Sequence, residues 1–236
     1  MKLSIVIPCY NEASVIKEHV ATVLDFLKGI EVDYELIVVN DGSKDNTGEI
    51  IETIPGIIPV NYSLNKGKGG AVKEGIKASS TGDYVIFMDA DLSTDLNAIK
   101  TTIPLLKEGR VIIASRKLKE SVLPVKRKFK RRLISWICKV LVNLRFHLHV
   151  SDSQCGFKAF DKNFAKEIIN HQIIERFAFD VEYLYMAKLN GLEIKEIPVT
   201  WTDDYRSSVV PMRSGKEFVK ALGKIKKNKK NYYFSK

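Results

Sequence analysis

Short apolar runs alternate with stretches of helical spacing over the first 115 residues, and this alternation limits the possible folds more than any other feature. The apolar runs predict strands over 3–8, 34–40, 60–64, 84–88 and 111–114. The stretches between them predict helices over 12–27, 47–54, 70–79 and 96–107. Strands and helices that alternate at this spacing form an α/β fold, with a mostly parallel sheet flanked by helices.

The second half of the chain lacks this alternation. Its pattern predicts a basic segment over 126–132, a helix over 133–150, a polar turn with an aromatic strand over 151–161, a helix over 179–190, a strand over 194–202 and a basic amphipathic helix over 214–236. The chain has no internal repeat and no linker rich in Pro, Gly or Ser. Residues 1–236 are therefore predicted to form a single domain with appended amphipathic helices.

Cysteine usage and the apolar runs bear on the compartment. Cys9, Cys138 and Cys155 lie far apart without CxxC spacing, which argues against a disulfide framework or a zinc site. The N-terminal apolar run is too short for a signal peptide, and no run approaches the ~20 residues of a membrane span. These features predict a cytoplasmic protein.

Most of the net charge of +10 belongs to two segments. Residues 116–132 carry a net +8 and residues 216–236 a net +7, so the rest of the chain is acidic. A basic cluster beside an apolar helix is typical of a helix that lies on an anionic membrane, and 126–150 is predicted to be such an interfacial helix. The alternatives are a core-packing helix and, for the tail over 214–236, a solvated run of charge.

Nucleic acid is the rival partner for a basic chain. The basic segments contain aromatic side chains that could stack on bases, among them Phe129 and Trp136. However, the chain contains no helix-turn-helix, zinc-finger or RNP pattern. We therefore expect a membrane surface, and no nucleic acid, as the partner of these segments.

Two carboxylates, Asp89 and Asp91, directly follow the apolar run 84–88. Residues two apart on a strand face the same way, so both side chains point to one place. Such oxygen ligands suit Mg²⁺ or Mn²⁺, whose coordination is often completed by substrate phosphates. The alternative is a pair of solvated carboxylates that cap the next helix. Because Asp41 ends another strand at the edge where such sheets bind ligands, we favour the metal site.

Two further strand-end features have open interpretations. Asp41 lies in an Asp-Gly turn, where its carboxylate accepts hydrogen bonds either from a base or ribose or only from the local backbone. The Gly-rich run 65–70 opens a helix and could bind phosphate through backbone N–H groups and two lysines. A flexible helix start is the alternative for this run.

Four motifs, in their order and spacing, resemble family 2 glycosyltransferases of the GT-A fold: IVIPCYNE, VVNDGSKDNT, NKGKGGAVKEG and MDADLS. Downstream, DSQCGFKAF, RFAFDVEYLY and EIPVTWTD are similar to the branch that makes polyprenyl-phosphate sugars, first dolichyl-phosphate β-glucosyltransferases and then dolichyl-phosphate mannose synthases. The resemblance covers nearly the whole chain.

The resemblance implies a role for each residue at a matching position. Residues expected to hold the nucleoside end of the donor are Pro8, Tyr10, Glu12 and Asp41. Asp89 and Asp91, on either side of Ala90, would bind the metal and through it the diphosphate. Residues expected at the phosphates or in the sugar and acceptor pocket are Arg116, Arg131, Asp152, Gln154, Lys158 and Asp180.

Two positions depart from the family pattern. Mannose synthases often carry a Gln that can join the metal shell where this chain has Ser93. Relatives usually carry a Lys that reaches the donor phosphates at the position that aligns with Ser208, so Arg206 or Arg213 is expected to substitute for it.

The reaction implied is an inverting transfer of a hexose from a sugar nucleotide, predicted to be UDP-glucose, to a polyprenyl or dolichyl phosphate. GDP-mannose and UDP-N-acetylglucosamine are the alternative donors, and a hydroxyl group, as on a cell-surface glycan, is the alternative acceptor. A phosphate is already anionic and needs no base, whereas a hydroxyl would require a carboxylate such as Asp180 to take its proton. The enzyme is expected to be peripheral on the cytoplasmic face of a membrane.

Overall fold

The computed structural model describes residues 1–79, 82–124, 129–202 and 211–234. Within these residues seven strands form one sheet in the order β3-β2-β1-β4-β6-β5-β7. Their bounds are β1 Lys2–Cys9, β2 Asp33–Asp41, β3 Ile58–Tyr62, β4 Tyr84–Met88, β5 Arg110–Ser115, β6 Phe157–Asp161 and β7 Glu193–Pro198. β6 runs antiparallel to β4 and β5, and the other neighbouring pairs are parallel. The mostly parallel α/β sheet predicted from the sequence is confirmed.

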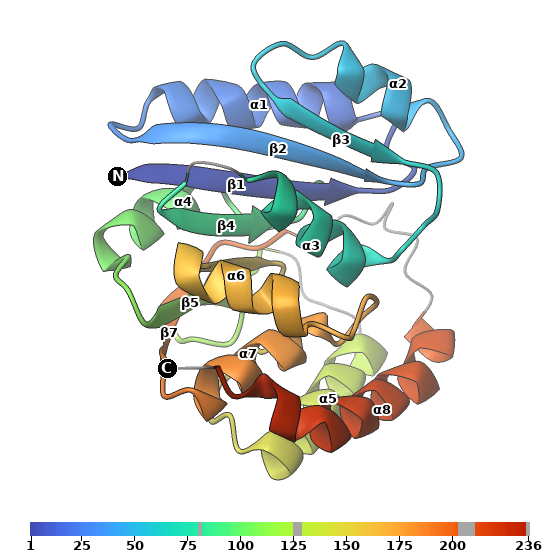
Figure 1. The fold of residues 1–236 in the computed structure, drawn as a ribbon, viewed down its shortest axis with the longest axis vertical. Coiled ribbons are helices and arrows are strands. Elements are labelled where there is room, and N and C mark those ends of the chain that lie inside the picture. The colour runs from blue at the N-terminus through green and yellow to red at the C-terminus, as the bar shows by residue number, and fades with distance from the viewer. Residues whose placement is uncertain (80–81, 125–128, 203–210, 235–236) are drawn as a thin grey trace.

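Helices cover both faces of this sheet, as Figure 1 shows. They are α1 Ile16–Lys28, α2 Thr47–Glu52, α3 Lys68–Ala78, α4 Asn97–Thr102, α5 Phe129–Phe146, α6 Lys162–His171, α7 Phe179–Leu189 and α8 Pro211–Lys227, with 3-10 turns η1 Ile103–Leu105 and η2 Asn228–Tyr232. Alternate residues of β1 enter different cores. Leu3, Ile5 and Ile7 pack with α1 and α4, and Val6 packs on the other face with α3, α6 and α7.

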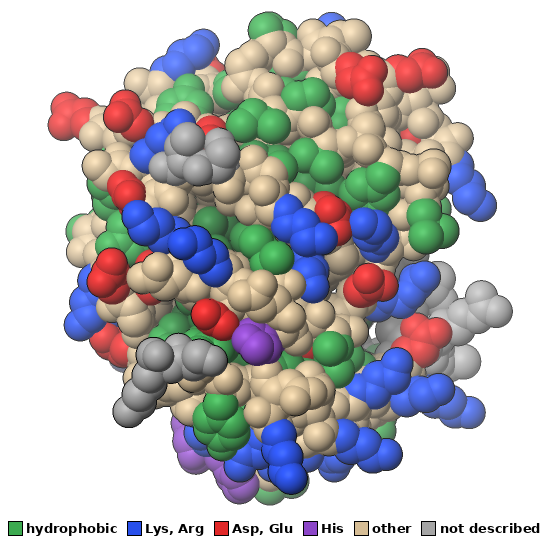
Figure 2. Space-filling view, in the orientation of Figure 1, with side chains coloured by type: hydrophobic (Ala, Val, Ile, Leu, Met, Phe, Trp, Pro, Cys, Tyr) green, Lys and Arg blue, Asp and Glu red, His purple; other side chains and the backbone are tan. Residues whose placement is uncertain are grey.

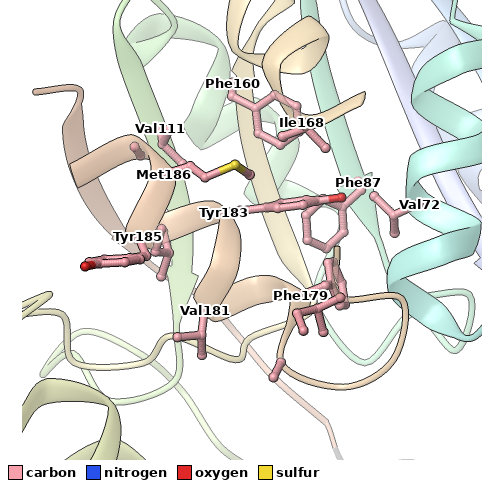
Figure 3. Packing of buried hydrophobic residues seen from close by; sticks show 14 of the residues in the cluster. Val72, Phe87, Val111, Phe160, Ile168, Phe179, Val181, Tyr183, Tyr185 and Met186 are labelled. Carbon is pink, nitrogen blue, oxygen red and sulfur yellow. The ribbon is translucent and has the colours of Figure 1, made fainter. Parts of the chain in front are cut away.

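The second of these cores is built around α7, which is buried from Phe179 to Ala187. In Figure 3 the Tyr183 ring lies between Phe87, Phe160 and Phe179. The ring centroid of Tyr183 is 5.3 Å from that of Phe179 and 6.2 Å from that of Phe160, a spacing typical of favourable aromatic pairs. A helix that is apolar on nearly every side must lie inside the protein, and this one fixes the position of Asp180 and Glu182.

Several predicted boundaries differ from the structure for identifiable reasons. The predicted helix over 96–107 divides into α4 and η1, because Pro104 cannot continue the hydrogen bonding of α4. The helix predicted over 133–150 ends at Phe146, where His147 takes a positive φ of 52°. The strand predicted over 194–202 ends at Pro198 as β7. The analysis missed α6, although Asp161 caps it by accepting from the Phe164 N–H at 2.8 Å.

The two basic helices differ in what their apolar sides meet. On α5, Trp136 is 60% and Leu144 70% exposed, and neighbouring apolar side chains are exposed as well. On α8, Phe218, Leu222 and Ile225 are buried in the protein's own core. The expectation of an appended interfacial helix is therefore wrong for the apolar side of α8, whose exposed side carries several lysines together with Glu217 and Val219. Among the described residues, no helix is long and apolar enough to cross a bilayer.

The packing of α3 against the sheet depends on Gly75. A Cβ atom added there would lie 2.3 Å from Val6 Cγ1 and 3.0 Å from Val39 Cγ2.

We expect Gly75→Ala to lower the free energy of unfolding by about 2 kcal/mol through overpacking, despite the better helix propensity of Ala. Gly223, in α8, is the matched control, because a Cβ there meets no described atom within 4 Å. Gly223→Ala should raise the stability by about 0.5–1 kcal/mol, and urea denaturation of both variants would measure the contrast.

Candidate functional site

The carboxyl ends of β1, β2, β4 and β5 meet at one edge of the sheet, and β6 starts there because it runs in the opposite direction. Asp89 follows β4, and its N–H donates to the Gly156 carbonyl at 3.1 Å, just before β6. A Cβ atom at Gly156 would lie 1.9 Å from Asp89 Oδ2. The Asp89 carboxylate therefore occupies space that only a glycine at 156 leaves open.

Asp89 and Asp91 lie on either side of Ala90 in the turn that follows β4, beyond the strand whose alternation the prediction used, and the Asp89 charge acts on Asp91. The Lys68 ammonium forms an ion pair with Asp89 Oδ1, and the Lys68 and Asp89 side chains are each 27% exposed. Burial and then the neighbouring Asp89 charge raise the pKa of Asp91. The backbone N–H of Ser93 donates to Asp91 Oδ1 at 2.9 Å, so Ser93 supports Asp91 from behind.

These residues fit a divalent metal ion. Two carboxylates converge, and a cation, the Lys68 ammonium, already neutralises one of them. The described part of the chain holds no group of three or more His, Cys, Asp or Glu side chains suited to a metal. A hard cation at this point would therefore complete its shell with water or with oxygens of a bound substrate.

Lys68 is a site residue that the sequence analysis did not single out. It is the first residue of α3, directly after Gly67, which has a φ of 89°. Burial acts to lower the pKa of Lys68, but the charges of Asp89, Asp180 and Asp91 outweigh it and raise the pKa. The KGKGG run carried a signal for such a site, because a lysine at a helix start is suited to an anionic ligand.

Asp41 holds the Gly-rich loop, residues 65–70. Its two carboxylate oxygens accept the N–H groups of Lys66 and Gly67, each at 2.8 Å, and Oδ1 also accepts the Tyr62 hydroxyl at 2.8 Å. Asp41 is only 3% exposed. The Asp41 carboxylate thus bonds to a loop distant in the sequence, and not to the backbone of its own turn as the local interpretation has it. The contact of Asp41 with a nucleoside stays a prediction.

The other residues predicted for the nucleoside differ in accessibility. Pro8 is buried within β1, Glu12 is half-buried at the end of the following turn, and Tyr10 is 38% exposed at the strand-end edge. The Ala90 carbonyl lies 2.8 Å from His19 Nδ1 of α1. Tyr10 therefore has the ring surface most available to a base.

Arg116 and Asp152, predicted for phosphate and sugar, bind each other. Arg116 Nε lies 2.7 Å from Asp152 Oδ2, and Nη2 lies 3.0 Å from Oδ1. The guanidinium also lies over the Trp201 ring, 5.2 Å from its centroid. Burial acts to raise the pKa of Asp152, but the Arg116 charge and hydrogen bonds lower it to about 2. Gln154 lies beside this pair, with its N–H 3.4 Å from Asp152 Oδ1.

Lys158 and Asp180 form a second, deeper pair. Lys158 is fully buried in β6, and its ammonium lies 2.5 Å from Asp180 Oδ1 and 2.9 Å from the Cys155 carbonyl. It also lies over the Phe87 ring, 5.3 Å from the centroid. The Asp180 carboxylate is therefore already paired with a buried lysine.

Three predicted phosphate ligands lie outside the described part of the structure. They are Arg206, which falls with Ser208 in a segment that is not described, and the side chains of Arg131 and Arg213. Their roles stay predictions.

Comparison with known proteins identifies the family of the chain. The family model "Glycosyl transferase family 2" matches residues 4–169. The chain belongs to this family. The resemblance drawn from the motifs is therefore confirmed, and the roles of the individual site residues stay predictions.

Similar proteins include two named dolichyl-phosphate beta-glucosyltransferase. The one from Dictyostelium discoideum is 34% identical over 95% of this chain and 73% of its own length, and the one from Homo sapiens is 31% identical over 94% and 74%. Among solved structures, glucosyl-3-phosphoglycerate synthase from Mycobacterium tuberculosis in complex with Mn²⁺, uridine diphosphate and phosphoglyceric acid has a TM-score of 0.69. It is 21% identical over 97% of this chain and 78% of that chain, which shows the shared fold.

The Arg116–Asp152 pair should make stability depend on pH in a specific direction. Because the folded pKa of Asp152 is lowered to about 2, its contribution is present above the unfolded-state pKa of about 3.9 and is lost as the pH falls toward 2. We expect Asp152→Asn to reduce the free energy of unfolding by about 3 kcal/mol at pH 7. This deficit should shrink between pH 5 and pH 3 in urea denaturation.

A matched control is Asp25→Asn, because Asp25 pairs with Lys28 at the surface, where its side chain is 83% exposed. That change should cost less than about 0.5 kcal/mol at any pH. A deficit of Asp152→Asn that stays constant from pH 7 to pH 3 would contradict the assignment.

Proposed function

We propose that this family 2 glycosyltransferase transfers a glucosyl residue from UDP-glucose to dolichyl phosphate or another polyprenyl phosphate, with inversion at the anomeric carbon. The observation that carries the proposal is the convergence of Asp89, Asp91 and the Lys68 ammonium at the strand ends. Support for the acceptor comes from the relatives named dolichyl-phosphate beta-glucosyltransferase, which match nearly all of this chain. A uridine diphosphate donor is supported by the complexes of the structural neighbour.

Asp89 and Asp91 are proposed to hold Mg²⁺ or Mn²⁺, which would neutralise charge on the leaving nucleoside diphosphate. Lys68, which pairs with Asp89 in this structure, would be the cation beside the diphosphate oxygens once a metal ion shares the Asp89 charge. Tyr10 provides a face for the base at the same edge. The Arg116–Asp152 pair stiffens the loop after β5 on the acceptor side.

In the transfer step an oxygen of the acceptor phosphate forms a bond to the anomeric carbon while the bond from that carbon to the diphosphate breaks. The electron pair of the broken bond leaves with the diphosphate. The acceptor phosphate is anionic at neutral pH, so no proton has to be removed and the protein only positions and desolvates it. Arg131, with its bidentate guanidinium, is the proposed phosphate ligand.

The buried Lys158–Asp180 pair distinguishes a phosphate acceptor from a hydroxyl acceptor. A hydroxyl would need a base, and Asp180 is the carboxylate proposed for that role. Asp180→Asn alone would leave a buried lysine unpaired, so the informative variant is Lys158→Met together with Asp180→Asn. We expect this double variant to keep more than about a tenth of the activity, whereas Asp91→Asn should lose at least ~100-fold.

Activity would be measured with Mg²⁺, a panel of sugar nucleotides and a polyprenyl phosphate, as formation of a lipid-soluble sugar product. Equal losses in Asp91→Asn and in the double variant would count against transfer to a phosphate without a general base. No lipid product with any donor would refute the polyprenyl phosphate as acceptor.

The exposed apolar side of α5 supports a second part of the proposal, peripheral attachment to the cytoplasmic face of a membrane. Leu133, Ile134, Trp136 and Ile137 are 43–60% exposed, and such a patch marks a binding surface. The basic residues of 126–132 precede or begin this helix. Figure 2 shows further Lys and Arg side chains gathered over α8, where Lys216, Lys220 and Lys224 are exposed. Each such cation near an anionic surface contributes about 1 kcal/mol.

Replacing both Trp136 and Leu144 by Ser should weaken binding to vesicles that contain anionic lipid by about tenfold or more. The melting temperature should stay nearly constant, because both side chains are exposed. Ile58→Ser, on the edge strand β3, is the control, since Ile58 is 36% exposed but lies far from α5 in the sheet order. Flotation would measure the binding. Unchanged flotation of the double variant, or tighter binding to a labelled oligonucleotide than to vesicles at physiological salt, would contradict membrane docking.

A further inference from the structure

The Gly-rich loop that carries Lys68 contacts the α6–α7 loop, residues 172–178. The Gly70 N–H donates to the Glu175 carbonyl at 2.8 Å, and Gln172 Nε2 donates to the Gly69 carbonyl at 2.9 Å. A Cβ atom at Gly69 would lie 2.6 Å from Phe179 Cβ. The two loops therefore touch backbone to backbone, and a shift of one displaces the other.

Asp41 also binds the Gly-rich loop, because its carboxylate accepts the Lys66 and Gly67 N–H groups. Lys68 is the next residue, and α3 starts with it. The direction of the Lys68 side chain toward Asp89 thus depends on the contacts of the Gly-rich loop with Asp41 and with the α6–α7 loop. Asp41 is part of β2, whereas the α6–α7 loop lies outside the sheet.

Glu182 holds the α6–α7 loop. This residue of α7 is fully buried, and its carboxylate accepts the Ile173 N–H at 2.8 Å, the Ile174 N–H at 2.9 Å and the Tyr232 hydroxyl at 2.5 Å. A buried carboxylate is costly unless it is hydrogen-bonded. Two of the donors belong to the α6–α7 loop and the third to the end of η2, so Glu182 joins these two segments at one point.

Tyr232 brings the C-terminal end of the described chain to this point. It is fully buried in η2, and its carbonyl accepts the Asn190 side-chain amide at 2.7 Å. Gln172 is fixed in turn by the Tyr183 hydroxyl, which donates to its Oε1 at 2.8 Å. A continuous series of hydrogen bonds and close contacts therefore runs from Tyr232 through Glu182 and the α6–α7 loop to the Gly-rich loop.

We propose that Glu182, together with Tyr232, is a positioning residue for sugar transfer: it fixes the α6–α7 loop, which holds the Gly-rich loop and thereby aims the Lys68 ammonium at Asp89 and the donor diphosphate. This inference rests on the proposed function in that Lys68 is taken to contact the donor. Glu182 itself touches neither the substrate site nor Lys68. Its effect must therefore depend on Lys68, and a residue that only stabilises the core would show no such dependence.

The test is a double-mutant cycle read out as the affinity for uridine diphosphate in the presence of Mn²⁺, measured by calorimetry. Glu182→Gln keeps the shape of the side chain but places an amide donor against one N–H, and Tyr232→Phe removes one hydroxyl. We expect affinity to fall about tenfold in Glu182→Gln and about threefold in Tyr232→Phe. In the Lys68→Met background each change should have less than about a twofold further effect.

Phe234→Leu is the matched control. The Phe234 ring packs on two residues of α6, with ring centroids 5.9 Å from Phe164 and 6.0 Å from His171. Within the described residues, no ring contact joins it to residues 172–178. It should lower the melting temperature without changing the affinity. A loss in Glu182→Gln that is equally large in the Lys68→Met background, or an equal loss in Phe234→Leu, would overturn the positioning role.

A second measurement needs no substrate. Amide hydrogen exchange of the ligand-free protein should speed up about tenfold or more across residues 65–72 in Glu182→Gln, with β1 and β2 unchanged. Unchanged exchange in that segment refutes the inference whatever the donor is. Absence of uridine diphosphate binding by the unmodified protein, with faster exchange in the variant, would instead refute the proposed donor and leave the positioning role supported.

Discussion

The ion pair between Lys68 and Asp89 joins two parts of the molecule that are held in place by different contacts. Asp89 belongs to the parallel sheet, and its position is set by the β4–β6 ladder and by the space that Gly156 leaves. Lys68 belongs to the Gly-rich loop, which Asp41 binds through two backbone N–H groups. Because the two charges are positioned by separate sets of contacts, their pairing depends on both supports. The chemistry proposed for this site depends on that coincidence.

Charge alternates from the strand-end edge into the core. Asp91 and Asp89 face Lys68, Asp180 acts on Lys68 from behind, and Lys158 neutralises Asp180. Two carboxylates so near each other are tolerated because a cation lies within reach of each. A divalent ion and an anionic diphosphate would enter this pattern together, so the local balance of charge changes little on binding. This property suits a site proposed to release an anionic nucleoside diphosphate after each turnover.

The sequence predicted most of the sheet, since apolar runs bounded by turns mark buried strands. It also indicated that Asp89 and Asp91 follow β4 at the ligand-binding edge, although both lie in the turn beyond the strand, so alternation along a strand does not set their direction. It did not predict that β6 inserts between β4 and β5, because pairing between strands so distant in the chain leaves no local pattern. Nor could it show that Arg116 and Asp152 bind each other, or that Lys158 is buried against Asp180. For a charged residue, type and position leave open whether the partner is a substrate or another side chain. The burial of the apolar stripe of α8 was missed for the same reason: amphipathicity predicts an apolar contact, but not whether that contact is lipid or protein.

The position of β6 also has a consequence for biosynthesis. Strand β4 pairs with β1 on one side and with β6, residues 157–161, on the other. Strand β5 also pairs with β6, so neither edge is complete until β6 has been made. While a ribosome is still adding the segment between β5 and β6, the nascent chain carries an open strand edge of the kind that invites pairing with other chains. Asp89 then lacks its contact with Gly156, and Lys68 lacks the α6–α7 loop. The order in which the chain emerges therefore keeps the sugar-transfer site unassembled until α7 has been made, so a prematurely released fragment would hold the motifs of the enzyme without its geometry.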